Sequence, residues 1–186
     1  MIWFTSDTHF ADRRVLLIDR RPFASLAAHD EALIGYWNET VAPEDEIWHL
    51  GDFTRGGPPG YADRLLATLH GRKHLIIGNN DDEVTVAAGG WLSVQHYKEM
   101  VLDGHLLILC HYPFRTWNKI GKKSVNLHGH SHGKLKPVTR QYDVGVDARQ
   151  FRPVALETIL NTRRHKAAAI AKAPASLDPL GSTHAD

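Results

Sequence analysis

Five short polar motifs recur directly after apolar, strand-like runs, and this recurrence constrains the fold more than any other feature of the chain. In order, the motifs are Asp7-Thr8-His9, Gly51-Asp52, Gly78-Asn79-Asn80-Asp81, His111 and Gly129-His130-Ser131-His132. The runs that precede them are MIWFTS, EIWHL, HLII, HLLILC and SVNLH. Polar side chains at strand ends project into the rim where α/β and layered β folds hold their sites. The pattern therefore predicts one site assembled at the ends of several strands.

The residue types in the motifs indicate metal binding. Asp, Asn and His side chains without cysteine are the oxygen and nitrogen donors that bind Mn, Fe, Ni or Zn at reactive sites. Taken alone, a His near a strand end is usually a surface or hydrogen-bonding residue. Asp7 could also cap a following helix, but that reading leaves His9 unexplained. All five motifs in order favour a two-metal hydrolase.

The motif set resembles the calcineurin-like metallophosphoesterase family over residues 1 to about 160, where the family pattern reads D-x-H, G-D, G-N-H-D/E, H and G-H-x-H. The resemblance implies an α/β fold, a four-layer α/β/β/α sandwich of two packed mixed β-sheets flanked by helices. It implies that one metal is held by Asp7, His9, Asp52 and His132. It implies that the other is held by Asp52, Asn79, His111 and His130, with Asp52 bridging.

The expected chemistry explains these residue types. Two divalent ions clamp phosphate oxygens and lower the pKa of bound water from about 15.7 to roughly 7, which makes hydroxide available. A carboxylate such as Asp52 has two equivalent anionic oxygens with which to bridge two cations. Because Asp7 and Asp52 are the only anionic ligands, the site stays cationic toward a phosphate.

One position departs from the family pattern. Where the family has a His that contacts the phosphate or protonates the leaving group, this chain has Asn80. Asn donates a hydrogen bond but cannot deliver a proton near neutral pH. Asp81 then has no imidazole to orient, and we expect it only to cap a helix starting near Asp82. The catalytic candidates are Asp52, Asn80 and Asp81.

The departure at Asn80 favours substrates whose leaving group needs little protonation, and it favours diesters, which carry less charge than monoesters. We therefore expect a phosphodiesterase that acts on a small or nucleotide phosphodiester through a metal-bound hydroxide. Two alternatives stay open. One is a phosphomonoesterase of small molecules or phosphoproteins, and the other is a non-catalytic metal-binding scaffold. Mn is the favoured metal, with Fe, Ni or Zn as alternatives.

Two loops beside the motifs carry candidate substrate-binding residues. Arg13 and Arg14 follow the first motif, and Arg115 and Trp117 follow His111. The arginines could bind phosphate oxygens bidentately, and Trp117 could stack on a base. The alternative is that the arginines are solvated and that Trp117 packs under its own loop.

Composition limits the classes of partner. A net charge of +1 and a pI near 8.0 give no sign of nucleic-acid or membrane binding. The single Cys110 excludes an intramolecular disulfide, and we expect a core thiol in a reducing compartment. There is neither a signal-peptide pattern nor a run of about 18 apolar residues. We expect a cytoplasmic protein with a small-molecule or nucleotide phosphoester substrate, and the oligomeric state stays open.

Periodicity gives the order of elements. We expect strands at 1–6, 46–50, 74–77, 92–102, 105–110, 124–129, 142–147 and 153–154. We expect helices at 26–41, 61–69 and 155–164, the first capped by Ser25, and a hairpin turn at Asp103-Gly104. Residues 1–164 should form one metallophosphoesterase domain. The Ala- and Pro-rich extension 165–186 should be poorly packed.

Overall fold

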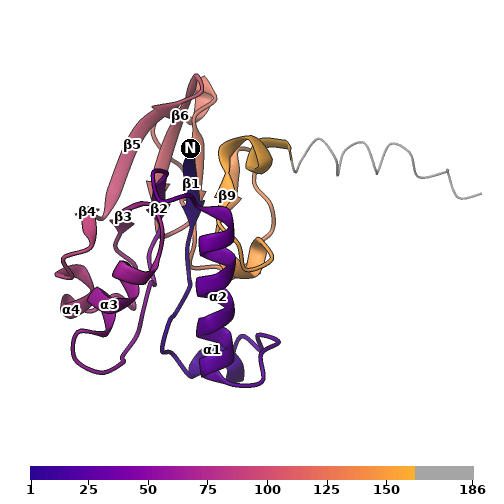
Figure 1. Ribbon diagram of the computed structural model, residues 1–186. Coiled ribbons are helices and arrows are strands. Elements are labelled where there is room, and N and C mark those ends of the chain that lie inside the picture. The colour runs from indigo at the N-terminus through magenta and orange to yellow at the C-terminus, as the bar shows by residue number, and fades with distance from the viewer. Residues whose placement is uncertain (162–186) are drawn as a thin grey trace, which may run out of the picture. The chain divides into compact units, whose positions relative to one another are not determined.

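The computed structural model describes residues 1–161 of the 186-residue chain (Figure 1). Two compact units divide the chain, Met1–Leu156 and Glu157–Asp186. The expected last helix is helical over 156–161, and the predicted extension 165–186 lies outside the described residues. Within residues 1–161, no helix is both long enough and apolar enough to cross a membrane.

The first sheet of the Met1–Leu156 unit has five strands in the order β4-β3-β2-β1-β9. They are β1 (Ile2–Thr5), β2 (Glu46–His49), β3 (Arg72–Ile76), β4 (Trp91–Gln95) and β9 (Val154–Ala155). Strands β1 to β4 run parallel to one another, and β9 is antiparallel to β1. Because parallel strands share a direction, the carboxyl ends of β1, β2 and β3 lie at one edge of the sheet.

The second sheet has four strands in the order β5-β6-β7-β8. They are β5 (Tyr97–Leu102), β6 (His105–Cys110), β7 (Val125–His128) and β8 (Gln141–Asp143). The pair β5–β6 is antiparallel and the other two pairs are parallel. The predicted fold of two mixed β-sheets with helices is therefore confirmed. The expected hairpin turn is also present, since Leu102 pairs with His105 and both turn residues have positive φ.

Two expected strands are wrong in extent. The single strand expected over 92–102 is two strands in different sheets, because β4 ends at Gln95, β5 begins at Tyr97 and the chain changes sheets at His96. No Gly or Pro interrupts residues 92–102, so the sequence offers no turn signal that would reveal the change. The strand expected over 142–147 ends at Asp143, and η2 (Val146–Ala148) follows as a 3-10 turn.

Helices α2 (Leu26–Thr40) and α3 (Tyr61–Thr68) cover one face of the first sheet (Figure 1). Leu33 and Trp37 from α2 and Leu66 from α3 share a buried cluster with Ile47 and Leu75 of the strands. The predicted cap is confirmed, since the Ser25 side chain accepts a hydrogen bond from the Ala28 N–H. The shorter helical segments are α1 (Arg14–Leu17), α4 (Glu83–Val86) and η1 (Ile120–Lys122).

The other face of the first sheet meets the second sheet. Phe4 and Trp48 are paired neighbours on β1 and β2, and both are buried. Lys98 of β5 lies over the Trp48 ring, with Nζ 5.8 Å from the ring centroid. Just beyond β1, Ser6 pairs with Gly145, which follows β8. Cys110 is buried, as a core thiol should be, and burial raises the pKa of its thiol.

Candidate metal centre

The loops that follow the strands hold the predicted ligands in an uncommon backbone conformation. Of the seven predicted metal ligands, five have a positive φ of 49° to 64°: Asp7, His9, Asp52, His130 and His132. Non-glycine residues rarely adopt this left-handed region, which costs roughly 1–3 kcal/mol each and is found preferentially at functional sites. The motifs therefore mark places where the chain turns sharply out of a strand.

Two motif glycines let these turns approach one another. A Cβ atom on Gly129 would lie 1.9 Å from Ser6 Oγ and 2.5 Å from Asp7 Oδ2. A Cβ atom on Gly78 would lie 2.3 Å from Asp52 Oδ1. Any side chain at either position would displace a carboxylate of the site, which explains why the two motifs begin with Gly.

One group of predicted ligands consists of Asp7, His9 and His132, whose ligand atoms all lie within 4.8 Å of one another. His132 Nε2 is 3.8 Å from Asp7 Oδ1, and His9 Nε2 is 3.5 Å from Asp52 Oδ2. Within residues 1–161, His9 Nε2 is buried and has no hydrogen-bond partner. The structure therefore brings together all four residues that were predicted to hold the first metal.

A second group consists of Asp7, Asp52 and His111. His111 Nδ1 contacts the Leu50 carbonyl at 2.8 Å, which leaves Nε2 facing Asn79 Oδ1 at 3.1 Å and Asp52 Oδ2 at 3.6 Å. The ring of His130 packs against that of His111, with centroids 5.1 Å apart, although His130 belongs to neither group of converging ligand atoms among the described residues. Asp7 belongs to both groups, and Asp52 Oδ2 lies within 3.6 Å of a histidine of each, His9 in the first and His111 in the second.

The electrostatics of these residues fit divalent cations. Burial raises the pKa of Asp7 well above its ordinary value. For Asp52, burial also opposes ionisation, but His111 and two hydrogen bonds from Asn80 hold its pKa below the ordinary value. A buried carboxylate with a raised pKa and an unpartnered imidazole nitrogen both gain from a cation placed between them. The residues present therefore suit a divalent metal site, and they do not specify which metal.

Sequence reasoning missed two residues that support the site from outside. Asp147 Oδ2 lies 2.8 Å from His132 Nδ1, so the carboxylate fixes the ring and leaves Nε2 directed toward Asp7. The buried Arg21 donates to Asp147 and to the backbone carbonyls of Asp7 and Thr8. Neither residue belongs to a motif. Asp147 lies in the strand expected over 142–147, and its acidic side chain was the only sign in the sequence that it could have a role. Nothing in the sequence marked Arg21.

Asp81 differs from the expectation. It was expected to cap a helix, but Asp82 caps α4 by accepting from the Thr85 N–H. Asp81 instead accepts from three backbone N–H groups, those of Asp52 and Gly78 at Oδ2 and that of Phe53 at Oδ1, at 2.7 to 2.9 Å. Asp81 therefore ties the loop that follows β2 to the loop that follows β3.

Asn80 links Asp52 to two arginines. Its backbone N–H and its Nδ2 donate to Asp52 Oδ1 and Oδ2 at 2.8 and 2.6 Å. Its Oδ1 accepts from Arg14 Nη2 at 3.0 Å and from Arg55 Nη1 at 2.6 Å. The structure therefore brings Arg14 next to a motif residue, and it adds Arg55, which was not among the predicted site residues.

The other substrate-binding candidates are placed less favourably. Arg13 and Arg115 are exposed. The ring of Trp117 is buried and its Nε1 donates to the Ser124 carbonyl, so Trp117 packs under its own loop. The expectation that Trp117 stacks on a base is therefore corrected, because the ring has no open face to offer.

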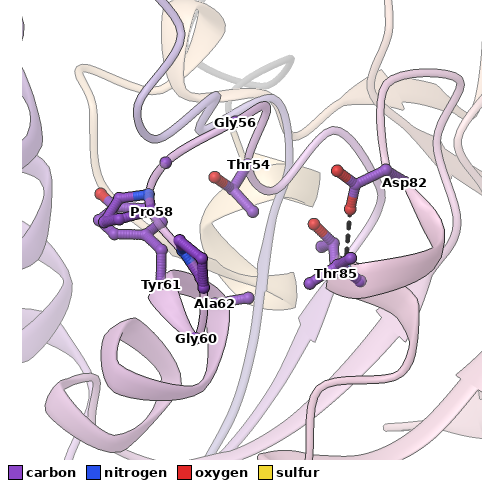
Figure 2. Close-up of a pocket in the computed structure, with 11 residues that line it drawn as sticks. Thr54, Gly56, Pro58, Gly60, Tyr61, Ala62, Asp82 and Thr85 are labelled. Carbon is purple, nitrogen blue, oxygen red and sulfur yellow. Dashed lines mark hydrogen bonds between the residues drawn. The ribbon is translucent and has the colours of Figure 1, made fainter.

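A small pocket adjoins Arg55. Its volume is about 360 Å³. Thr54 and Gly56, the two neighbours of Arg55, line it on one side, and Asp82 and Thr85 line it on the other (Figure 2). Tyr61 completes the wall at the start of α3. Asp82, which lines the pocket, is separated from Asn80 in the chain by Asp81 alone.

Comparisons with known proteins agree with this geometry. The family model of calcineurin-like phosphoesterases matches residues 1–168, so the chain belongs to that family. The gene 66 protein of Mycobacterium phage D29 is 33% identical over 178 residues, covering 79% of this chain and 88% of the phage protein. That of Mycobacterium phage L5 is 27% identical over 179 residues, covering 78% and 86%.

A solved structure has the same fold. The protein of unknown function AQ665 from Aquifex aeolicus superimposes with a TM-score of 0.69 at 22% identity, covering 87% of this chain and 98% of that one. Family membership makes the chain a metallophosphoesterase by class, with an Asp/His cluster suited to divalent metal.

Proposed function

We propose that the chain is a two-metal phosphodiesterase that hydrolyses a small or nucleotide phosphodiester. Asp7, His9, Asp52 and His132 would hold one ion, and Asp52, Asn79, His111 and His130 the other. When bound, two such ions supply a lowered pKa of water and a clamp on phosphate oxygens. With no thiolate among the donors, Mn is the favoured metal, with Fe, Ni or Zn as alternatives.

The observation that carries the diester preference is the side chain of Asn80. It lies against Asp52, with Nδ2 2.6 Å from Oδ2, at the position where the family places an imidazole. An amide holds Asp52 in place by hydrogen bonding, but it has no proton to give to a leaving group. Substrates with a leaving group that departs readily as an anion are therefore favoured, and a diester carries less charge for the site to neutralise.

A specific observation supports a phosphomonoesterase as the second candidate. Arg14 and Arg55 both reach Asn80 Oδ1, so the position that lacks an imidazole has two guanidinium groups beside it. These groups could neutralise the second charge of a monoester. Of the predicted substrate-binding residues, Arg14 is the best placed for that contact, and the exposed Arg13 and Arg115 could join it only by moving toward the ligands.

Parallel assays with a diester and a monoester of the same chromophore test the proposal. We expect the metal-loaded protein to have the higher kcat/KM for the diester. A higher kcat/KM for the monoester would establish the second candidate instead. Absence of hydrolysis of both esters by protein with two bound ions would leave the metal-binding scaffold.

The variant Asn80→His tests whether Asn80 sets the preference. A general acid contributes typically about 10²–10⁴-fold, but Asp81 already accepts from three backbone N–H groups, which leaves it little capacity to orient a new ring. We therefore expect the monoester-to-diester ratio of kcat/KM to rise only to the low end of that range, with metal content unchanged. A ratio that stays constant or falls while both ions remain bound would assign the preference to the arginine loops.

A further inference from the structure

Arg55 stands on a firmly held backbone beside the candidate metal centre. Its N–H donates to the Phe10 carbonyl at 3.0 Å, and the Thr54 hydroxyl donates to the same carbonyl at 2.7 Å. Phe10 and Thr54 also form a parallel bridge, so the loops that follow β1 and β2 run side by side here. The side chain of Arg55 therefore starts from a fixed point close to both ligand-bearing loops.

The guanidinium of Arg55 is exposed and directed toward the site. Its Nη1 donates to Asn80 Oδ1 at 2.6 Å, and the Nδ2 of the same amide donates to Asp52 Oδ2 at 2.6 Å. One amide therefore separates Arg55 from the carboxylate that lies between the two groups of predicted ligands. A guanidinium has five N–H donors, and this contact uses one of them.

The charge of Arg55 is not balanced by the protein. Arg14, which shares the acceptor Asn80 Oδ1, is paired with the carboxylate of Asp12 at 2.6 Å. Among residues 1–161, Arg55 has no carboxylate within ion-pair distance. Two cations thus converge on one neutral oxygen, and only Arg14 has a carboxylate at ion-pair distance. An anion bound beside Arg55 would offset their like-charge repulsion.

We propose that Arg55, positioned by Asn80, binds a non-bridging oxygen of the substrate phosphate and supplies by charge the contact that an imidazole at position 80 would make. This inference rests on the proposed phosphoesterase function. Because guanidinium stays protonated and is not a proton donor for catalysis, Arg55 stabilises phosphate charge without protonating the leaving group. Arg55 is therefore a specificity residue for the anionic phosphate, and Asn80 is its positioning residue.

Equilibrium binding of inorganic phosphate to the metal-loaded protein tests this inference independently of turnover. Calorimetry would compare the wild type with Arg55→Gln, Arg55→Lys and the matched control Arg72→Gln. Arg72 is an exposed arginine at the amino end of β3, paired with Glu46 at 3.5 Å, and so lies at the opposite end of the strand from the site. Metal content of every variant is measured in parallel.

A hydrogen bond to a charged group contributes about 1.5–3 kcal/mol, which corresponds to a loss on the order of 10- to 100-fold in phosphate affinity for Arg55→Gln. Arg55→Lys should restore part of it, because lysine keeps the charge but not the fork of donors. Arg72→Gln should bind phosphate as the wild type does. Unchanged affinity in Arg55→Gln, or a loss matched by Arg72→Gln or by loss of metal, would overturn the assignment.

The outcomes separate this inference from the proposed function. If the wild type binds phosphate through Arg55 but hydrolyses no phosphoester, the proposed function fails and the anion site stands. If the wild type hydrolyses phosphoesters and Arg55→Gln retains the wild-type phosphate affinity and kcat/KM, the anion site fails and the proposed function stands.

Discussion

Replacing Asp81 by Ala tests whether this carboxylate holds the site together. In the structure it accepts from the backbone N–H groups of Asp52, Phe53 and Gly78. Alanine leaves all three donors without that acceptor. The donors lie in two loops that pack closely together, since a Cβ atom on Gly78 would lie 2.3 Å from Asp52 Oδ1. We expect the protein to lose stability and the Asp52 side of the site to lose metal affinity.

The magnitude follows from the number of donors. Each buried donor that loses its partner costs about 1–3 kcal/mol. Because Asp81 is half-buried and water can enter beside the shortened side chain, we take the low end for each donor. Three donors then come to about 3 kcal/mol at roughly 1 kcal/mol each. For a chain of this length, 1 kcal/mol corresponds to a change in Tm of roughly 2–4 °C, so we expect Tm to fall by about 6–12 °C.

Asp82→Ala is the matched control. Asp82 is the next residue, and its side chain caps α4 by accepting from one N–H, that of Thr85. Loss of such a cap costs about 1 kcal/mol, or roughly 2–4 °C in Tm. Thermal unfolding by circular dichroism in chelator would be compared for the two variants, with metal content measured after reloading. If Asp81→Ala unfolds at the same temperature as Asp82→Ala and binds as much metal as the wild type, the anchoring role is refuted.

Three further perturbations follow from the geometry. Asp52→Asn removes an anionic oxygen between the two ligand groups. Elemental analysis should show loss of at least one ion, and activity assays should show near-complete loss of turnover. Two retained ions with wild-type turnover would contradict this. A strong chelator should abolish phosphoester hydrolysis and added Mn should restore it, so turnover by metal-free protein would end the two-metal interpretation. Burial lowers the pKa of His49 to about 3, so as pH falls from about 6.5 the unfolded chain takes up a proton that the folded protein does not. The free energy of unfolding should therefore decrease by about 1.4 kcal/mol per pH unit on account of this residue. Denaturant titrations at pH 7 and pH 5 should show a smaller decrease for His49→Gln than for the wild type, and an equal decrease would exclude the linkage.

The sequence was most informative where chemistry and strand pattern coincide. Asp7, Asp52 and Asn79 each stand within three residues of a strand end, and parallel strands carry their ends to one edge. Residue type and position along the strand were therefore enough to predict that these side chains meet. His111 directly follows β6, and Ser25 directly precedes α2. The residues next to them were therefore again enough to predict where these two side chains lie.

The sequence was least informative where a contact depends on distant parts of the chain. Arg21 and Asp147 are 126 residues apart, and their ion pair exists only because both lie against Asp7 and His132. No local period or spacing marks such a pair. The change of sheet at His96 was hidden for the same reason, because the sheet that a strand joins is set by strands far away in the sequence.

The strained turns of the site are offset by hydrogen bonds of the protein itself. The Asp7 N–H donates to the Gly51 carbonyl at 2.9 Å, and the His9 N–H donates to the Asp52 carbonyl at 3.0 Å. The backbone N–H of His130 then donates to the Asp7 carboxylate at 3.0 Å. Three of the five left-handed ligands, Asp7, His9 and His130, are therefore each held by a backbone hydrogen bond to another motif of the protein. It follows that removal of metal should act first on the charge of the site, while the loops that carry Asp7 and Asp52 stay in place and can accept the ion again.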